Sequence, residues 1–456
     1  MNRLLWLTVV ASLAWAYLPC VSPAAGWKVG LARVEITPSE PTWMAGYAGR
    51  NRPAEGTAQP LWAKALAVSD PDGSTAVLVT ADILGLTREV GDRVAAEVEA
   101  QKGIPRERIM LAASHTHSGP VVCGCADVCH PMGEKDLAAA MRYREEELIP
   151  KLAEVIVEAL DKRVPARLWL GQSEAHFAEN RRLPENGRIV MKPNLQGPVD
   201  PTVPVVVVKD DADRLMALLF GYACHNTTLD PAIYRYHGDY AGCAQAALEQ
   251  EYPGITAMFI AGCGADANPR GRSAGIEVAE RHGRELAQAV KSALTGELKE
   301  LHPPLRVGFT RVDLELADRP SRETVAAWAE SKELFRRRLG EHLLRIWDAQ
   351  GMIPAASSCP IQVLRFGNDW ALVGIGGEVV VDYALRLRKE LAGTPHWVAG
   401  YCNEVFGYVP SERVLAEGGY EADYSQIYFG WHGPYKPGLE DKIVAAVKGL
   451  LAATAP

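Results

Sequence analysis

Two histidines, two residues apart, follow an apolar segment in the first third of the chain. The run Ala113-Ser-His115-Thr-His117-Ser-Gly-Pro120 comes directly after the strand-like residues 109–113. In an extended chain, residues i and i+2 point to the same side, so both imidazoles can face one site. Ligands bind most often at the ends of strands in α/β sheets. The run therefore indicates a metal or catalytic site, and a surface loop that happens to contain histidine is the alternative.

Two later segments have a similar arrangement of an apolar strand followed by polar side chains. Residues 216–222 lead into Ala223-Cys-His225-Asn-Thr-Thr228, and residues 371–375 lead into Gly376-Gly377-Glu378. Glycines allow a close backbone approach, which leaves the following carboxylate free to point at a metal. Two imidazoles and a carboxylate form a common catalytic zinc set with a position left for water. For Glu378 alone, an acidic residue at a helix N-terminus is the simpler interpretation.

The elements that must hold these side chains alternate between strands and amphipathic helices. Strands are expected at 27–37, 61–69, 75–82, 109–113, 205–208, 216–222, 257–261, 362–366 and 371–375. Helices are expected at 88–101, 145–163, 241–251, 276–294 and 440–452, with a helical insertion at 324–350. This alternation predicts an α/β fold: one large domain over residues 26–456, with a mixed β-sheet core flanked by helices and the metal site at strand ends.

The N-terminal 25 residues have the order of a secretory signal. Arg3 precedes an apolar run from Leu4 to Leu18, and the small residues Ser22-Pro-Ala-Ala25 follow it. This pattern predicts export, with cleavage near Ala24 or Ala25. An uncleaved anchor is the alternative, but the run is short for a span of about 20 residues. We therefore expect a secreted or periplasmic protein without a transmembrane span after cleavage.

The composition excludes several classes of protein. The chain has 456 residues, of which 48% are hydrophobic and 23% charged, which is ordinary for a soluble globular protein. Its formal net charge is -8, without basic runs. A mildly acidic chain of this kind is a poor candidate for binding nucleic acid. The expected partner is a small-molecule or lipid acyl substrate. The sequence predicts no particular oligomeric state.

Eight cysteines remain once Cys20 is assigned to the signal. An even number in an oxidising compartment permits disulfides, whose connectivity cannot be read from the sequence. Three of them lie in Cys123-Gly-Cys125-Ala-Asp-Val-Cys129-His130, where thiolates beside a histidine could instead hold zinc. Disulfide pairing is the favoured expectation.

The motifs together resemble the catalytic domain of the neutral/alkaline (non-lysosomal) ceramidases. The opening residues 29–38, the segment Met44-Ala-Gly-Tyr47 and the run 115–120 carry the resemblance. The resemblance implies that one Zn²⁺ per chain is bound by His115, His225, Glu378 and Tyr408. It also implies that His117, Arg181 and Tyr420 are active-site residues.

Three features depart from the family pattern. The family's active-site serine corresponds to Ala267 when the two are matched at Gly264. The glycine-rich continuation after the histidine motif is replaced by the cysteine cluster 123–129. The chain also ends soon after the helix expected at 440–452, so the family's C-terminal β-sandwich is expected to be absent.

The predicted chemistry is hydrolysis by water activated on zinc. The metal lowers the pKa of its bound water to about 7 and polarises an acyl carbonyl. Arg181, His117 or Tyr420 could donate to the oxyanion, and His117 could instead carry a proton to the leaving amine. We expect an exported zinc-dependent, ceramidase-like amidohydrolase that cleaves an N-acyl amide bond. A zinc-dependent esterase or lactonase acting on a polar or carbohydrate-linked acyl substrate is one alternative, and a non-catalytic binding relative is the other.

Three further carboxylates lie near predicted strand ends. They could orient the metal ligands from behind, although exposed loop positions are expected for at least one of them. These residues are Asp82, Asp239 and Asp266.

Overall fold

The computed structural model describes residues 26–456. The predicted signal sequence, residues 1–25, therefore lies outside the described residues. Among the helices of residues 26–456, none combines the length with the hydropathy that a membrane span requires.

A large mixed sheet forms the centre of the molecule. Its nine strands have the order β12-β10-β9-β6-β1-β3-β4-β5, with β14 pairing on β6. Two of its pairs, β4 with β5 and β10 with β12, are parallel, and the others are antiparallel. The strands are β1 (Trp27–Glu35), β3 (Trp62–Ser69), β4 (Thr75–Ala81), β5 (Ile109–Ala113), β6 (Val164–Glu174), β9 (Thr202–Asp210), β10 (Leu215–Tyr222), β12 (Thr256–Ala261) and β14 (Lys299–Leu301).

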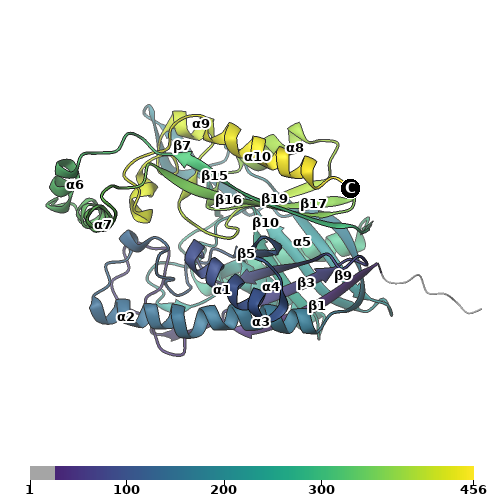
Figure 1. Cartoon of the computed structure of the whole chain (residues 1–456). Coiled ribbons are helices and arrows are strands. Elements are labelled where there is room, and N and C mark those ends of the chain that lie inside the picture. The colour runs from purple at the N-terminus through teal and green to yellow at the C-terminus, as the bar shows by residue number, and fades with distance from the viewer. Residues whose placement is uncertain (1–25) are drawn as a thin grey trace, which may run out of the picture.

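A second, four-stranded sheet packs against the first (Figure 1). It contains β15 (Leu305–Glu315), β16 (Ala356–Phe366), β17 (Trp370–Ile375) and β19 (His396–Ala399) in that order. Buried apolar side chains from both sheets form one cluster between them, for example Leu78 and Met110 from the large sheet with Leu364 and Leu372 from the small one. Burial of this shared layer holds the two sheets together.

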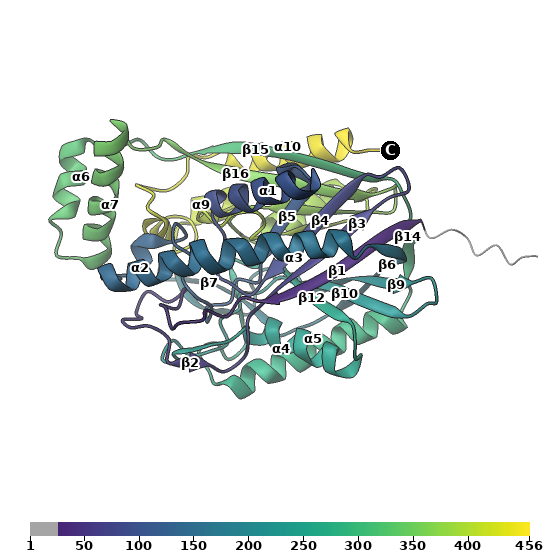
Figure 2. The ribbon, with the colours of Figure 1, turned by 60° about the horizontal axis from the view of Figure 1, so that its bottom comes forward.

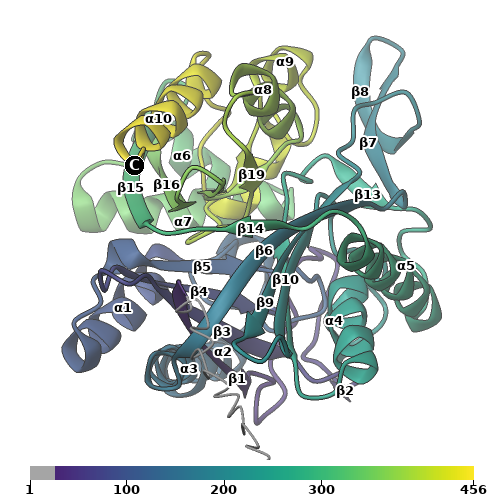
Figure 3. The ribbon, with the colours of Figure 1, turned by 90° about the vertical axis from the view of Figure 1, so that its right-hand side faces the viewer.

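Helices cover the two outer faces, so the layers run helix, sheet, sheet, helix (Figure 3). The large sheet packs against α1 (Arg88–Lys102), α3 (Ile149–Asp161), α4 (Asp239–Glu251) and α5 (Ile276–Thr295). The small sheet packs against α8 (Asp382–Glu390) and α10 (Leu439–Ala453). In α3, buried Leu152, Val155, Ile156 and Ala159 lie at the spacing of one helix face, which explains why this segment packs as it does. The predicted fold class is confirmed, although the strands form two stacked sheets.

Two hairpins lie outside these layers. The helical pair α6 (Arg322–Ala329) and α7 (Leu334–Gln350) stands at one end of the molecule, next to α2 (Glu134–Arg142) in Figure 2. The sequence predicted one helical insertion at 324–350, and the structure divides it at residues 330–333. The strand hairpin of β7 (Ala178–Glu185) and β8 (Arg188–Asn194) extends away from the sheets in Figure 3.

The remaining elements are short. The helix expected at 145–163 begins instead with a π-helical segment, Tyr143–Leu148, which joins α2 to α3. The other elements are β2 (Gly56–Thr57), β11 (Arg235–Tyr236), β13 (Ala267–Pro269), β18 (Glu378–Val379), β20 (Tyr408–Val409), α9 (Glu412–Glu417) and three 3-10 turns, Arg106–Arg108, Asp127–Cys129 and Tyr424–Phe429.

Candidate metal centre

Three strands deliver the candidate ligands to one place. His115 follows the end of β5, His225 follows β10, and Glu378 follows β17. Glu378 then pairs in register with Tyr408, because β18 and β20 form a short parallel ladder. The prediction that the site lies at strand ends is confirmed by this arrangement.

The two histidine segments are bonded directly to each other. Thr116 and Asn226 form a parallel bridge, and the backbone N–H of His117 donates to the carbonyl oxygen of Asn226 at 3.2 Å. His115 has a φ of 61°, in the left-handed region that a residue with a side chain rarely adopts. Such strain is held in place by surrounding contacts and is concentrated at functional sites.

Two glycines make room for the side chains of the centre. A Cβ atom on Gly46 would lie 2.5 Å from the ring of His117, so only glycine fits there. Gly377 has a φ of +82°, and a Cβ atom on it would lie 2.7 Å from Val409. The close backbone approach expected for the glycines before Glu378 is therefore present.

Nitrogen and oxygen atoms of five side chains converge on one point. Oε2 of Glu378 lies 3.2 Å from Nε2 of His115 and 3.1 Å from Nε2 of His225. Nε2 of His117 lies 3.3 Å from Nε2 of His115, and the hydroxyl of Tyr408 lies 3.3 Å from Nε2 of His225. Ligand atoms of the three histidines all lie within 4.8 Å of one another. This buried group can bind a metal ion.

The hydrogen-bonding pattern of the rings fits a cation. Nδ1 of His115 lies 2.7 Å from the carbonyl oxygen of Leu84, and Nδ1 of His225 lies 3.0 Å from that of Gly264. Because a carbonyl oxygen can only accept, each Nδ1 carries the hydrogen and each Nε2 presents a lone pair. Two such nitrogens and a carboxylate oxygen then face one another at 3.1–3.2 Å as three acceptors. A divalent metal cation would satisfy this donor set.

The surroundings keep these groups in the charge state that a metal requires. Burial, helped by Arg181, lowers the pKa of His225 to about 4, and burial beside two other imidazoles lowers that of His117 well below its ordinary value. The imidazole of His225 is therefore neutral near neutral pH, as a metal-binding imidazole must be.

Arg181 supports the centre from behind Tyr408. Its guanidinium donates to the Tyr408 hydroxyl at 3.0 Å and to Oε1 of Glu421 at 2.7 Å. The carbon of the guanidinium lies 5.6 Å from the centroid of the Tyr420 ring, which is itself 5.4 Å from that of Tyr408. Burial raises the pKa of both tyrosines, so both hydroxyls keep their hydrogens near neutral pH.

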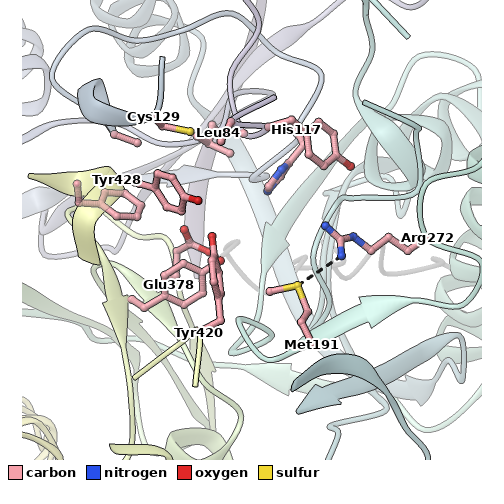
Figure 4. Close-up of a pocket in the computed structure, with 14 residues that line it drawn as sticks. Leu84, His117, Cys129, Met191, Arg272, Glu378, Tyr420 and Tyr428 are labelled. Atoms are coloured by element: carbon pink, nitrogen blue, oxygen red, sulfur yellow. Dashed lines mark hydrogen bonds between the residues drawn. The ribbon is translucent and has the colours of Figure 1, made fainter. Parts of the chain in front are cut away.

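A cavity of ≈ 190 Å³ opens onto the centre (Figure 4). Figure 4 shows His117 on one side, Glu378, Tyr420 and Tyr428 on another, and Arg272 with Met191 across from them. The cavity is smaller than the roughly 300–1,000 Å³ of pockets that enclose drug-sized ligands. It is lined by Gly46, Tyr47, Ala48, Leu84, His117, Ala126, Cys129, Met191, Arg272, Glu378, Tyr408, Tyr420, Tyr428 and Phe429.

The structure brings all the sequence-predicted site residues together. These are His115, His117, Arg181, His225, Glu378, Tyr408 and Tyr420. One placement differs from expectation: Arg181 does not line the cavity, and its guanidinium is occupied by Tyr408, Glu421 and Asn268.

The three nearby carboxylates do not contact the histidines. Asp82 accepts from the Trp62 backbone and Gln245, Asp239 from the Thr228 and Leu229 backbones, and Asp266 from the Val381 backbone and Asn180. All three are buried, so the exposed-loop interpretation was wrong. The carbonyls of Leu84 and Gly264 orient the ligands instead, because backbone carbonyls lie closest to the two rings.

Two departures from the family pattern, Ala267 and the cysteine cluster 123–129, lie in the described part of the chain. Ala267 is buried in β13, where its carbonyl oxygen accepts from the His225 backbone N–H at 3.0 Å.

The eight cysteines of residues 26–456 are free thiols, so the expected disulfides are not found there. Nor do Cys123, Cys125 and Cys129 gather as metal ligands within the described residues. Cys129 lines the cavity, and burial raises the pKa of its thiol to about 12.

Two site residues were not predicted from the sequence. Tyr401 follows β19, and its ring centroid lies 4.4 Å from that of His115. It follows a strand end in the same way as His115 and His225, which is the signal that could have found it. Arg272 lies in a loop without a local pattern, and no sequence signal points to it.

Comparison with known proteins agrees with the geometry. A neutral ceramidase of Drosophila melanogaster is 25% identical over 257 residues, which is 54% of this chain and 35% of that protein. A neutral ceramidase of Pseudomonas aeruginosa is 24% identical over 490 residues, covering 91% of this chain and 71% of that one. This chain thus spans about a third of the first relative and over two thirds of the second.

A solved structure shares the fold. The crystal structure of neutral ceramidase from Pseudomonas aeruginosa superposes with a TM-score of 0.71 at 20% identity, over 94% of this chain and 74% of that chain. The family model described as neutral/alkaline non-lysosomal ceramidase, N-terminal, matches residues 27–289. Since that match covers more than half of the sequence, the chain belongs to the neutral/alkaline non-lysosomal ceramidase family.

Proposed function

We propose that the protein is an exported, zinc-dependent hydrolase that cleaves an N-acyl amide bond. The relatives described above are named neutral ceramidases, and that name indicates amide hydrolysis for those proteins. The observation that carries the proposal is the convergence of Nε2 of His115, Nε2 of His225 and Oε2 of Glu378 at 3.1–3.2 Å beside a cavity. Membership of the family supports the amide as the bond that is cleaved. Export rests on the secretory pattern of residues 1–25.

The ligands proposed for one zinc ion are His115, His225, Glu378 and Tyr408. A zinc ion bound there would supply Lewis-acid activation of a water molecule and of the acyl carbonyl. Nε2 of His117 also approaches this group, at 3.3 Å from His115, so His117 is either a further ligand or a neighbour that moves a proton. Measuring the metal content of His117→Ala separates the two roles.

Two cavity-lining side chains are placed to handle charge and protons during the reaction. His117 is neutral and has a buried Nδ1 without a hydrogen-bond partner among the described residues. Such an imidazole can carry a proton to the leaving amine. Tyr420 lines the same cavity with its proton retained, so it can donate to negative charge that develops on the carbonyl oxygen. Arg181 positions Tyr408 and keeps the second tyrosine in place through contact with its ring.

The test is metal content together with amide hydrolysis. We expect purified wild-type protein to contain about one zinc per chain and to hydrolyse a short-chain N-acyl amide or ceramide. His115→Ala and Glu378→Gln should lose both properties. His176→Ala is the matched control, because the side chain of His176 is 68% exposed and, within residues 26–456, forms an ion pair only with Glu174. Full activity in His115→Ala, or protein without zinc that is fully active, would remove the proposal.

A zinc-dependent esterase or lactonase is the second candidate. The observation in its favour is the volume of ≈ 190 Å³, which is small for a lipid with two long chains. If only small esters or lactones are turned over in parallel assays with ceramide and short amides, the second candidate replaces the first.

A further inference from the structure

One cation on the cavity wall has no role in the metal centre. Arg272 lines the cavity and lies across it from Glu378 (Figure 4). Its one hydrogen bond among the described residues is to Sδ of Met191, at 3.5 Å. No carboxylate of residues 26–456 lies within ion-pair distance of its guanidinium. A guanidinium that faces a ligand cavity without a carboxylate partner is suited to receive an anion from the ligand.

The positive charge of Arg272 is not balanced by another residue of the cavity wall. Glu378 is the one acidic residue among those that line the cavity, and its carboxylate is already engaged by His115 and His225. A zinc ion held by these groups would add further positive charge to the same cavity. The cavity therefore favours a ligand that brings a negative charge of its own.

The loop that carries Arg272 is fixed to the histidine segment. The backbone N–H groups of Ser273 and Ala274 donate to the carbonyls of Thr227 and Thr228 at 3.3 and 2.7 Å. These two threonines follow His225 closely in the chain. The position of the Arg272 backbone relative to a metal ligand is thus set by hydrogen bonds over a few residues, which is how specificity residues are held at a fixed distance from the reacting atoms.

Arg270, in the same loop, has hydrogen-bond partners that give it a structural role. Arg270 donates to Oε1 of Glu179 at 3.0 Å and to the carbonyl of His176 at 3.2 Å. It does not line the cavity. The two arginines are both exposed and lie two residues apart, but only Arg272 faces the place where a substrate would bind.

We propose that Arg272 binds a carboxylate of the substrate, so that the preferred substrates are short N-acyl amides that carry a carboxylate near the scissile bond. This inference rests on the proposed function for the reaction, but the recognition of the carboxylate is a separate property. The carboxylate could belong to the amine half, as in an N-acyl amino acid, or to the acyl half, as in a dicarboxylic acid monoamide. Either source presents the same group to the guanidinium.

The test uses two matched pairs of probes with the zinc-loaded protein. For the amine half, N-acetylglycine is compared with N-isobutylacetamide. For the acyl half, N-methylsuccinamate is compared with N-methyl-4-methylpentanamide. In each pair an isopropyl group of similar shape replaces the carboxylate. Binding is measured by calorimetry, and hydrolysis is measured in parallel as kcat/KM.

We expect wild-type protein to bind the carboxylate member of at least one pair about tenfold or more tightly, in line with a charge-assisted hydrogen bond. Arg272→Gln should remove that preference, so that the ratio of the two affinities within the pair falls to about one. Arg270→Gln should keep the preference. The pair that shows it identifies which half of the substrate carries the charge. The preference should also weaken as ionic strength rises, because Arg272 is exposed.

Two results would overturn the inference. One is equal binding of both members in both pairs by wild-type protein. The other is a carboxylate preference that survives in Arg272→Gln. Failure of the proposed function looks different: the preference in binding is present, but no amide is hydrolysed under any condition.

Discussion

The guanidinium of Arg181 donates a hydrogen bond of 3.0 Å to the hydroxyl of Tyr408, which in turn lies 3.3 Å from Nε2 of His225. A buried arginine is thus one hydrogen bond away from the candidate metal centre. Its charge is balanced by Glu421, which also receives a hydrogen bond of 2.7 Å from Arg182. Two cations and one carboxylate are therefore buried together directly behind Tyr408 and Tyr420.

This buried group makes Glu421 a sensitive position for stability. Removing one partner from a buried ion pair leaves an uncompensated charge, which typically costs about 3–5 kcal/mol. We expect Glu421→Gln to lower the free energy of unfolding by that amount in urea titrations, with Arg181 and Arg182 left in a 2–4% exposed site. Glu417→Gln is the control: Glu417 also pairs with Arg182 but is 34% exposed, so its loss should change stability by about 1 kcal/mol or less. Equal effects of the two substitutions would contradict this interpretation.

Metal removal should destabilise the folded protein. A ligand that binds only the native state stabilises it by about 2.7 kcal/mol at a hundredfold excess over its Kd. A strong chelator should therefore lower the Tm by several degrees, and added zinc should restore it. In His225→Ala the Tm should respond little to either treatment, because one of the facing lone pairs is gone. An identical response of wild type and variant, measured by calorimetry, would show that zinc stabilises the protein elsewhere.

The helical hairpin should influence substrate binding through the loop that it holds. Arg338 of α7 donates to the backbone carbonyls of Asp127, Val128 and His130 at 3.0, 2.9 and 2.7 Å. The same loop supplies Ala126 and Cys129 to the cavity wall. Arg338→Gln removes donors worth about 1 kcal/mol each, so the wall should become mobile.

We expect Arg338→Gln to raise KM severalfold while kcat changes little, because the proposed zinc ligands lie on other segments. Arg337→Gln is the matched control on the same helix, since the polar partners of the Arg337 guanidinium within the described residues are only Ser331 and Glu341. Steady-state kinetics on one amide substrate make the comparison. A fall in kcat at unchanged KM would assign Arg338 to a different role.

The sequence predicts those site residues whose own segment carries a recognisable pattern, and it misses those that are positioned by distant contacts. His115, His225 and Glu378 each follow an apolar strand, so a rule about strand ends finds them without knowledge of the fold. Tyr408 and Arg181 have no such signal, and only the order of motifs in a known family points to them. Arg272 is placed by backbone bonds to Thr227 and Thr228, about 45 residues earlier, and no local pattern encodes such a contact.

For the fold, too, the sequence predicts individual strands but not the long-range contacts between them. Strands that are largely buried, such as β4 and β10, follow from the sequence because their residues are mostly apolar. The hairpin β7–β8 was missed, since no residue of Arg188–Asn194 is fully buried and its apolar residues do not alternate with polar ones. The stacking of two sheets depends on contacts such as Met110 with the Leu372 layer, and nothing in either segment specifies its partner.

A buried carboxylate beside the centre should make stability depend on pH. Asp266 is 0% exposed and accepts hydrogen bonds from the Val381 backbone at 2.9 Å and from Asn180 at 3.2 Å. Burial is the main reason that its pKa is raised from 3.8 to about 6. The folded protein thus keeps this proton over a range of pH in which the unfolded chain has already released it.

The sign of the effect follows from that difference. Below pH 3.8 both states are protonated; as the pH rises from 3.8 to about 6, only the unfolded state ionises, so the free energy of unfolding falls. The total decrease is about 3 kcal/mol, at about 1.36 kcal/mol per pKa unit, and it is complete above pH 6. Asp266→Asn cannot ionise, so the wild-type stability minus the variant stability should fall by this amount across the window in urea titrations. Asp348→Asn, at a 62% exposed position, should leave the pH profile unchanged. A wild-type-minus-Asp266→Asn difference that is flat or rises with pH would show that Asp266 is ionised in the folded protein.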